Sequence, residues 1–440
     1  MLLIPLNSNA SADVVKSKAI DFVHYDATLE PSFNEKSVKG IVKIKFIAKA
    51  KNIKEVVFSA KYKTIFNVFS EQVAVQYDVS GDLLVIKFNK PLDDGKEYNV
   101  SIEYLSQPEK GMKFYQDHLF TIYHTKNWLI SHTDINDKAS FELHLIHNGN
   151  FTSVGNGKLI SQQKIADGKL ISYWQQSLPI PIYTFGFVLG KFQTAVDSYK
   201  GSTLSYLFRT KEKSNFDTKD IKKIFVDVPD MVQFFEEKSG VALPNNAYKY
   251  IFVDGAIAQE AAGFSLIGER YGHTVLQDIN ENWFIAHELA HEWWGNSITC
   301  ANFSHFWLNE GLVQFLVAAY KEHLFGEEAY KKEIQIAISR VNRAVKEERL
   351  SPVAFKHEIA ETEINRTMVY SKGALVFYML RKELGDKFFW QALRKYSKTY
   401  NGKSVTTQNL KLIFESETGQ DLDKFFDRWV YGNEIPELAL

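Results

Sequence analysis

The first part of the chain alternates between apolar and polar residues with the two-residue period of a β-strand. The clearest segments are 42–47, 83–88 and 99–104. Turn-forming residues such as Ser80-Gly81-Asp82 and Asp93-Asp94-Gly95 separate them. Another strand pattern, 178–183, continues into 185–190, and its prolines indicate a sheet edge or the entry to a strand. The pattern predicts β-structure from about Ala19 to Phe192.

The period changes after about Tyr199. Apolar residues at helical spacing predict one helix over 219–238, followed by a strand over 248–253. Asp278-Ile279-Asn280-Glu281 has the form of a capping box, which predicts the start of another helix directly after it. Beyond residue 310 the pattern is almost entirely helical. The clearest helical segments there are 329–346, 371–384 and 421–429.

These two patterns predict an α+β protein of more than one domain. We expect an antiparallel β domain over residues 1–200 and a mainly α-helical domain over 201–440. Apolar residues make up 45% of the chain and aromatic residues 14%, which is ample for buried cores. No internal repeat or low-complexity linker interrupts either region.

Charge and cysteine content exclude several classes of function. Lys and Arg number 52 against 53 Asp and Glu, so no overall positive charge favours nucleic acid. Cys300 is the only cysteine, which excludes an intramolecular disulfide. No run of about 20 apolar residues predicts a transmembrane segment. Residues 1–6 are too short for the apolar region of a signal peptide, and the sequence leaves both cytoplasmic and exported destinations open.

His287-Glu288-Leu289-Ala290-His291 is an HExxH motif, the feature of the chain that most strongly indicates chemistry. Residues four apart lie on one face of a helix, so both imidazoles can bind one metal ion. Glu288 lies next to the first histidine, where its carboxylate can accept a proton from water at the metal. The alternative is a pair of structural histidines, and that interpretation weakens once a third ligand is found.

Glu310 supplies this third ligand in the segment Trp307-Leu308-Asn309-Glu310-Gly311. The apolar residues that follow predict a second helix with Glu310 near its start. The other known spacing, HExxHxxGxxH, does not fit, because Trp294 and Ser297 stand where it needs glycine and histidine. Two histidines and one glutamate predict a single Zn²⁺ ion with an open fourth position.

The two segments 287–296 and 307–311 resemble the signature of the aminopeptidase N family of gluzincin metallopeptidases almost position for position. The resemblance extends to His24-Tyr25, to 180–183 with Gly190, and to 421–430. It implies a saddle-like β domain, a thermolysin-like zinc peptidase domain, one Zn²⁺ ion and peptide substrates. It also implies a short form without the family's C-terminal helical domain, and therefore a more open active site.

The resemblance also implies roles for two further residues. Tyr370, in Tyr370-Ser371-Lys372-Gly373, matches the family's catalytic tyrosine, which stabilises the oxyanion; the alternative is a packing tyrosine. Glu260 matches the glutamate that binds the free α-amine of the substrate; the alternative is a surface glutamate. The family's second amine-binding residue comes from the β domain, and Gln116 is the nearest candidate.

The chain departs from the family at two places. In the family's G-x-M-E-N segment only the glutamate remains, within Ile257-Ala258-Gln259-Glu260-Ala261. Glu292 stands where the family usually has glutamine, and it is either a group that bonds a metal ligand or a solvated helix charge. The resemblance implies a zinc aminopeptidase. An endopeptidase with an eroded amine site and an inert peptide-binding protein are the alternatives.

Overall fold

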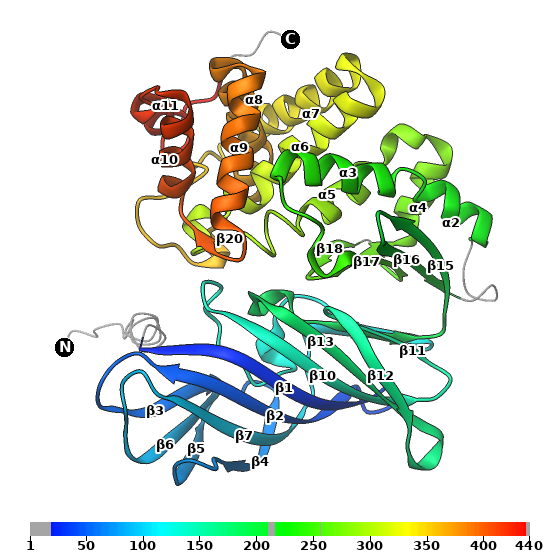
Figure 1. The fold of residues 1–440 in the computed structure, drawn as a ribbon, viewed down its shortest axis with the longest axis vertical. Helices are drawn as coiled ribbons and strands as arrows, with labels where there is room; N and C mark the ends of the chain where they lie inside the picture. Colours follow the sequence, from blue (N-terminus) through cyan, green and yellow to red (C-terminus); the bar gives the residue numbers. More distant parts are fainter. Residues whose placement is uncertain (1–18, 210–215, 256, 437–440) are drawn as a thin grey trace. The chain divides into compact units, whose positions relative to one another are not determined.

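The computed structural model describes residues 19–209, 216–255 and 257–436 (Figure 1). Its contacts divide the chain into two compact units, one ending at Phe192 and one beginning at Gln193. The segment 1–6, considered above as a possible leader, lies outside the described residues. Among the described residues, no helix combines the length and the apolar character needed to cross a membrane.

The first unit consists of β-sheets. Its seven-stranded sheet has the order β12-β13-β10-β1-β2-β7-β4, a four-stranded sheet has the order β11-β14-β9-β8, and a three-stranded sheet has the order β3-β6-β5. The strands are β1 Ile20–Ser32, β2 Ser37–Ala48, β3 Ile53–Ser59, β4 Lys63–Phe69, β5 Val75–Ser80, β6 Leu83–Leu92, β7 Glu97–Ser106, β8 Met112–Phe114, β9 His118–Thr121, β10 Lys138–Asn148, β11 Thr152–Gly155, β12 Lys158–Lys164, β13 Lys169–Pro181 and β14 Phe187–Gly190.

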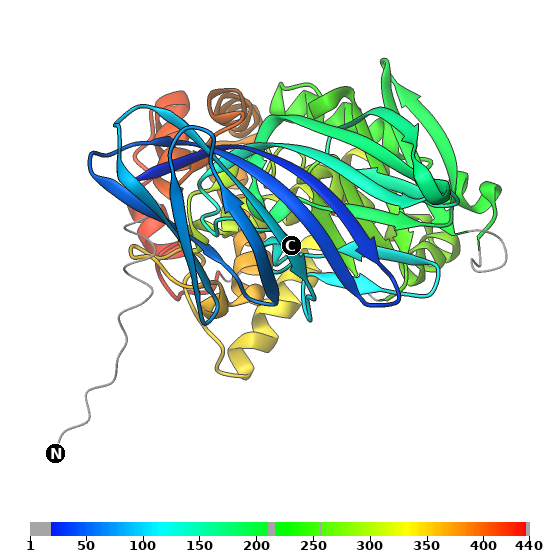
Figure 2. The ribbon, with the colours of Figure 1, turned by 90° about the horizontal axis from the view of Figure 1, so that it is seen from below.

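Alternation of side chains accounts for the large sheet. On β2 the side chains of Val42, Ile44 and Phe46 are fully buried, whereas the lysines between them are more exposed. The sheet is antiparallel as predicted, except that β1 and β10 run parallel. Figure 2 shows the long, curved course of β1 and β2. The strand predictions at 42–47, 83–88 and 99–104 are confirmed by β2, β6 and β7.

The second unit combines a five-stranded sheet with helices. The sheet has the order β15-β16-β17-β19-β18, and its three central strands are parallel. Its strands, with the short pair β20 and β21, are β15 Phe192–Tyr199, β16 Ser202–Arg209, β17 Ala247–Val253, β18 Ala258–Ala261, β19 Phe264–Gly268, β20 Thr299–Cys300 and β21 Ser404–Val405. The helices are α2 Thr218–Ile224, α3 Val228–Ser239, α4 Glu269–Gln277, α5 Trp283–Ala290, α6 Trp307–Phe325, α7 Glu327–Lys346, α8 Gly373–Leu384, α9 Asp386–Tyr400, α10 Thr407–Thr418 and α11 Asp423–Trp429.

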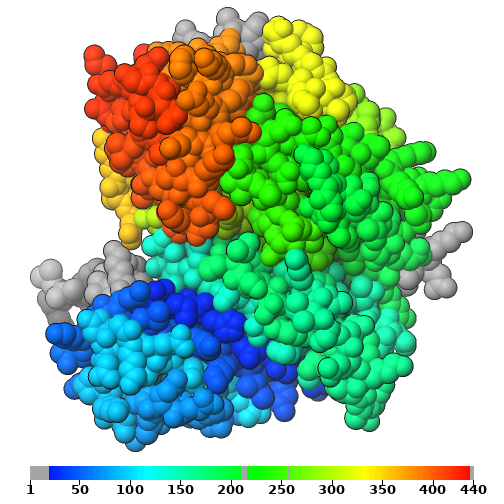
Figure 3. Space-filling model, in the orientation of Figure 1, coloured from blue at the N-terminus to red at the C-terminus, as the bar shows by residue number. Residues whose placement is uncertain are grey.

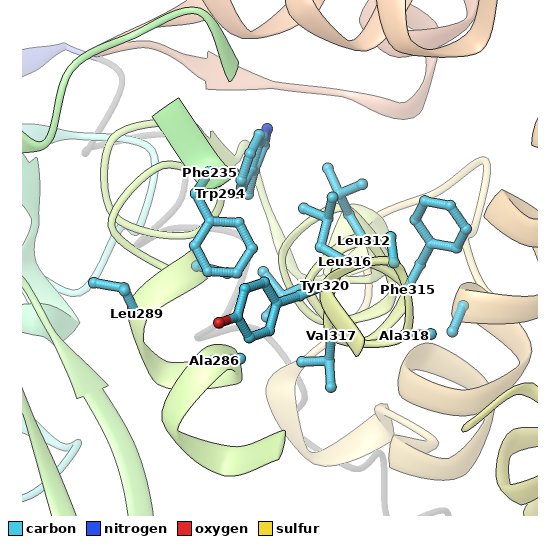
Figure 4. Close-up of a cluster of buried hydrophobic side chains, with 14 of the residues drawn as sticks. Phe235, Ala286, Leu289, Trp294, Leu312, Phe315, Leu316, Val317, Ala318 and Tyr320 are labelled. Atoms are coloured by element: carbon cyan, nitrogen blue, oxygen red, sulfur yellow. The ribbon is translucent and has the colours of Figure 1, made fainter. Parts of the chain in front are cut away.

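Helix α6 is buried along most of its length and forms the centre of the second unit. Figure 4 shows Leu312, Phe315 and Leu316 of α6 in the apolar cluster that also holds Ala286 and Leu289 of α5. The cluster therefore fixes the two helices that carry the predicted metal ligands against each other. Helices α8 to α11 form one contiguous part of the surface of this unit (orange to red in Figure 3).

Three helix predictions need correction. The single helix expected over 219–238 is two helices, α2 and α3, because Pro229 starts a new helix in the first turn of α3. Asp278 caps a short 3₁₀ turn, Ile279–Glu281, and not α5, whose N-cap Asn282 makes no side-chain capping bond. The helix expected from Ser371 is preceded by a π-helix, Met368–Lys372, which runs directly into α8.

Candidate metal centre and active site

His287 and Glu288 lie in the last turn of α5, and His291 is the residue at its C-cap. Glu310 lies in the first turn of α6, as the sequence predicts. All four residues are buried, each with at most 6% of its surface exposed. Tyr248 and Tyr250 of β17 hold α5 in place, because their hydroxyls donate to the carbonyl oxygens of Glu288 (2.9 Å) and Ile285 (2.8 Å).

The three predicted ligand atoms form a nearly equilateral triangle. His287 Nε2 lies 3.2 Å from His291 Nε2, and Glu310 Oε2 lies 3.4 Å from each of them. Two ligands bound to Zn²⁺ at about 2.0–2.1 Å with tetrahedral geometry are about 3.4 Å apart. The spacing of these atoms therefore fits a tetrahedral metal ion with one position left open.

The tautomer of His291 also fits a metal ligand. Its Nδ1 lies 3.0 Å from the carbonyl oxygen of Trp294, which can only accept, so Nδ1 carries the proton and Nε2 presents its lone pair. The chain can turn back around the ring because the next residue is Gly295, with a φ of 142°. A Cβ at Gly295 would lie 2.7 Å from His291 Nδ1. This glycine is therefore required for the bond that orients the ligand.

Several carboxylates make the site favourable for a cation. Burial lowers the pKa of His291, but Glu310 and Glu260 outweigh it and raise the pKa to about 10. Burial and the charge of Glu260 raise the pKa of Glu288 well above its usual value. Among the described residues, Oε2 of Glu288 and Oε2 of Glu310 are buried atoms without a hydrogen-bond donor. Buried oxygens of this kind need a positive partner, and a divalent metal ion would supply one.

Tyr370 lies beside the metal ligands, half-buried in the π-helix. Its ring and that of His287 are nearly parallel, with an interplanar angle of 12° and centroids 6.0 Å apart. Glu260 lies on β18 and is 5% exposed, which rules out the alternative of a surface glutamate. Burial raises the pKa of Glu260 to about 7, and the charge of His291 lowers it in part. The charges of His291 and Glu310 both act on Glu260.

The remaining candidates fall in different places. Gln116 is an exposed residue between β8 and β9 of the first unit. Glu292 is only 2% exposed, so the solvated helix charge is the wrong interpretation. Its Oε1 accepts from the backbone N–H of Gly263 (2.7 Å) and from Nδ2 of Asn296 (2.9 Å). No pattern in the sequence predicts the contact with Gly263, which lies 29 residues away.

Comparisons with known proteins show which proteins this chain is similar to. The model of the peptidase family M1 domain matches residues 231–429. Aminopeptidase M1-B of Oryza sativa subsp. japonica is 26% identical over 317 residues, covering 68% of this chain and 35% of the relative. Aminopeptidase N of Escherichia coli (strain K12) is 25% identical over 299 residues, covering 64% of this chain and 33% of the relative. The chain thus spans about a third of the length of these two relatives.

Solved structures match over nearly the whole chain. An M1 zinc metallopeptidase variant from Deinococcus radiodurans, bound to a Tyr-Ser-Ala substrate, has a TM-score of 0.82 and 20% identity, covering 96% of each chain. A second structure of the M1 zinc metallopeptidase from this organism has a TM-score of 0.80, covering 96% of this chain and 95% of the other. At this identity the match establishes the fold: a β-rich region followed by a mainly helical region. Residues 231–429 therefore match the peptidase family M1 domain, in agreement with the resemblance of the sequence to the aminopeptidase N family.

Proposed function

We propose that this protein is a zinc-dependent aminopeptidase that removes N-terminal residues from peptides. The observation that carries the proposal is the triangle of His287 Nε2, His291 Nε2 and Glu310 Oε2, with sides of 3.2 to 3.4 Å. The aminopeptidase relatives and the zinc metallopeptidase structures support the same activity. We propose residues 201–440 as the thermolysin-like peptidase domain and residues 1–200 as the β domain.

His287, His291 and Glu310 would hold the metal ion. Neutral imidazoles and one carboxylate are the ligand set of catalytic zinc sites, and the tautomer of His291 suits this role. Bound there, one Zn²⁺ ion would act as a Lewis acid that lowers the pKa of water and polarises the scissile carbonyl.

Glu288 is the proposed general base. Its carboxylate follows the first ligand in sequence and is buried, and Oε2 has no donor among the described residues. A metal ion would oppose the rise in pKa that burial causes, so the carboxylate could accept a proton from water and pass it to the leaving amine. Tyr370 would donate a hydrogen bond from its hydroxyl to the carbonyl oxygen as negative charge develops there.

Glu260 is the proposed partner of the substrate's free α-amine. An ammonium group beside this buried carboxylate would favour its ionised form and form a charge-assisted hydrogen bond. Acetylation removes the positive charge of the amine, so an acetylated peptide would leave Glu260 buried without a partner. The proposal therefore predicts a strong preference for substrates with a free amine.

The test is hydrolysis of fluorogenic amino-acid amides and short peptides, each with its amine free or acetylated, with and without a chelator. We expect cleavage of the free-amine set alone, loss of activity on chelation and recovery with Zn²⁺. Cleavage of the acetylated set at similar rates would overturn the exopeptidase assignment and indicate an endopeptidase. No turnover of either set with metal bound would favour the inert binding protein.

A further inference from the structure

The turn between β18 and β19 is held by two charged side chains at a single residue, Gly263. Glu292 Oε1 accepts from the N–H of Gly263 at 2.7 Å, and Lys249 Nζ donates to its carbonyl oxygen at 3.1 Å. Gly263 has a φ of 83°, a conformation that favours glycine. The N–H of Gly263 is therefore held by the side chain of Glu292, and its carbonyl oxygen is held by both Nζ and the backbone N–H of Lys249 (3.2 Å).

Both of these side chains are buried. Glu292 is 2% exposed and Lys249 is 8% exposed, and each stabilises the charged form of the other. Burying two charges is unfavourable unless they are paired and hydrogen-bonded, and an apolar pair often gives equal or greater stability. Stability alone therefore does not account for a buried glutamate and a buried lysine at this turn.

Glu292 connects the metal centre to the proposed amine site. It follows the ligand His291 directly in sequence, and the turn that it binds begins two residues after Glu260. Within the hairpin Glu260 pairs with Ser265 and Ala261 with Phe264, so a shift of the turn moves Glu260 as well. Asn296 donates to the same Oε1 of Glu292 at 2.9 Å, which fixes the position of that oxygen.

We propose that Glu292 is a positioning residue, which sets the distance from the metal centre to Glu260 by holding Gly263, with Lys249 as its counterpart. The inference rests on the aminopeptidase function proposed above. The preference for substrates with a free amine then depends partly on a residue that does not touch the substrate. Glu292 would therefore act on substrate binding only through Glu260.

The test is a double-mutant cycle of Glu292→Leu with Glu260→Ala, measured as kcat and KM on a free-amine amide. Leucine removes the acceptor for Gly263 at similar volume. We expect Glu292→Leu alone to lower kcat/KM about tenfold or more, chiefly through KM, and to have little further effect in the Glu260→Ala background. Glu292→Gln keeps an acceptor oxygen, so it should retain activity within about threefold.

The chain offers a matched control in Lys321 and Glu333, a buried ion pair on α6 and α7. Glu333→Leu makes the same chemical change as Glu292→Leu away from the hairpin, and it should leave KM unchanged. Zinc content and thermal stability are measured for every variant. If Glu292→Leu does not fold, Lys249→Met removes the other contact to Gly263 and takes its place in the cycle.

Full additivity of the Glu292 and Glu260 substitutions would overturn the proposal, as would a rise of KM in Glu333→Leu equal to that in Glu292→Leu. Loss of zinc from Glu292→Leu would also overturn it, because the effect would then lie at the metal. Failure of the aminopeptidase function itself is distinguishable, because the wild-type enzyme would then show no preference for a free amine.

Discussion

Gly311 and Gly373 are in direct contact where α6 meets the start of α8. A Cβ on either residue would lie 2.9 Å from the Cα atom of the other, and a Cβ on Gly311 would also lie 2.8 Å from the carbonyl oxygen of Val369. Gly311 follows the ligand Glu310, and Gly373 comes three residues after Tyr370. This contact therefore sets how closely the proposed oxyanion donor approaches the metal ligands.

Gly311→Ala should separate these two segments. We expect a loss of stability of about 1–3 kcal/mol from overpacking, and a larger loss of kcat than of zinc affinity. The measurements are thermal unfolding, kcat and zinc content. Gly272→Ala is the control, because Gly272 lies on a different helix, α4. Its added Cβ would meet the rings of Phe216 and Phe252. Equal losses of kcat in both variants would indicate general destabilisation.

Tyr370→Phe removes one hydroxyl and keeps the ring beside His287. If the phenol stabilises the oxyanion, kcat should fall by about 100- to 1,000-fold, with KM and zinc content little changed. Steady-state kinetics with a free-amine amide measure both constants. A kcat within a factor of about two of wild type would show that Tyr370 only packs.

Glu288→Gln tests the general base. The amide is nearly the same size but cannot accept a proton, so we expect kcat to fall by at least about 100-fold. Zinc content should stay at one ion per chain, because Glu288 is not among the three ligands proposed here. Binding of peptides to this variant, followed by calorimetry, should persist. Undiminished turnover would remove Glu288 from the mechanism.

Removal of the metal should lower stability as well as activity. Glu260, Glu288 and Glu310 interact electrostatically with one another in a buried site, and a divalent cation offsets their repulsion. We expect the chelated protein to melt at a lower temperature and Zn²⁺ to restore the melting temperature as its concentration rises. Glu310→Gln should weaken this response to Zn²⁺. An identical melting curve with and without chelator would contradict the prediction.

Asp137 should make the stability of the first unit depend on pH. Burial raises the pKa of Asp137 to about 8, although its carboxylate oxygens accept from the N–H of Phe22 at 3.1 and 3.2 Å. The folded state then binds a proton that the unfolded state releases at lower pH, so this group reduces stability progressively from about pH 4 to pH 8.

In the Asp137→Asn variant residue 137 cannot ionise. The melting temperature of the variant should therefore exceed that of the wild type by an amount that grows between pH 5 and pH 8. Melting curves collected across that range give the comparison directly. Parallel curves for the two proteins would mean that Asp137 is ionised in the folded state throughout.

The grouping of the three proposed metal ligands could be predicted because their geometry is local. The positions of His287 and His291 follow from helical spacing, and the apolar run after Gly311 places Glu310 in the first turn of α6. The break between α2 and α3 was also present in the sequence, as Pro229, but the apolar spacing continued across it and predicted one helix. In the structure the helix-start residue Pro229 prevails over the continuous apolar spacing.

The capping-box prediction was wrong, and the role of Glu292 could not be predicted, for different reasons. Asp278 has the residue type of a cap, but its side chain bonds Asn280 in a 3₁₀ turn before α5 begins. The sequence left Glu292 as either a group that bonds a metal ligand or a solvated helix charge, because its partner, Gly263, comes from a hairpin 29 residues earlier. A contact of this kind depends on how the sheet packs against the helix, and no periodicity in the chain records it.

The direction in which the side chain of Tyr370 points, relative to α8, depends on the extra residue in the π-helix Met368–Lys372. A π-turn accommodates one more residue than an α-turn, so deletion of a single residue here would restore a regular α-helix. Every side chain before the deletion would then rotate by about 100° relative to Gly373 and the rest of α8. The ring of Tyr370 would then no longer lie beside His287, although the helix remained intact. A shortened chain could therefore fold normally and still have no catalysis, which makes the residue count of this segment as important as its composition.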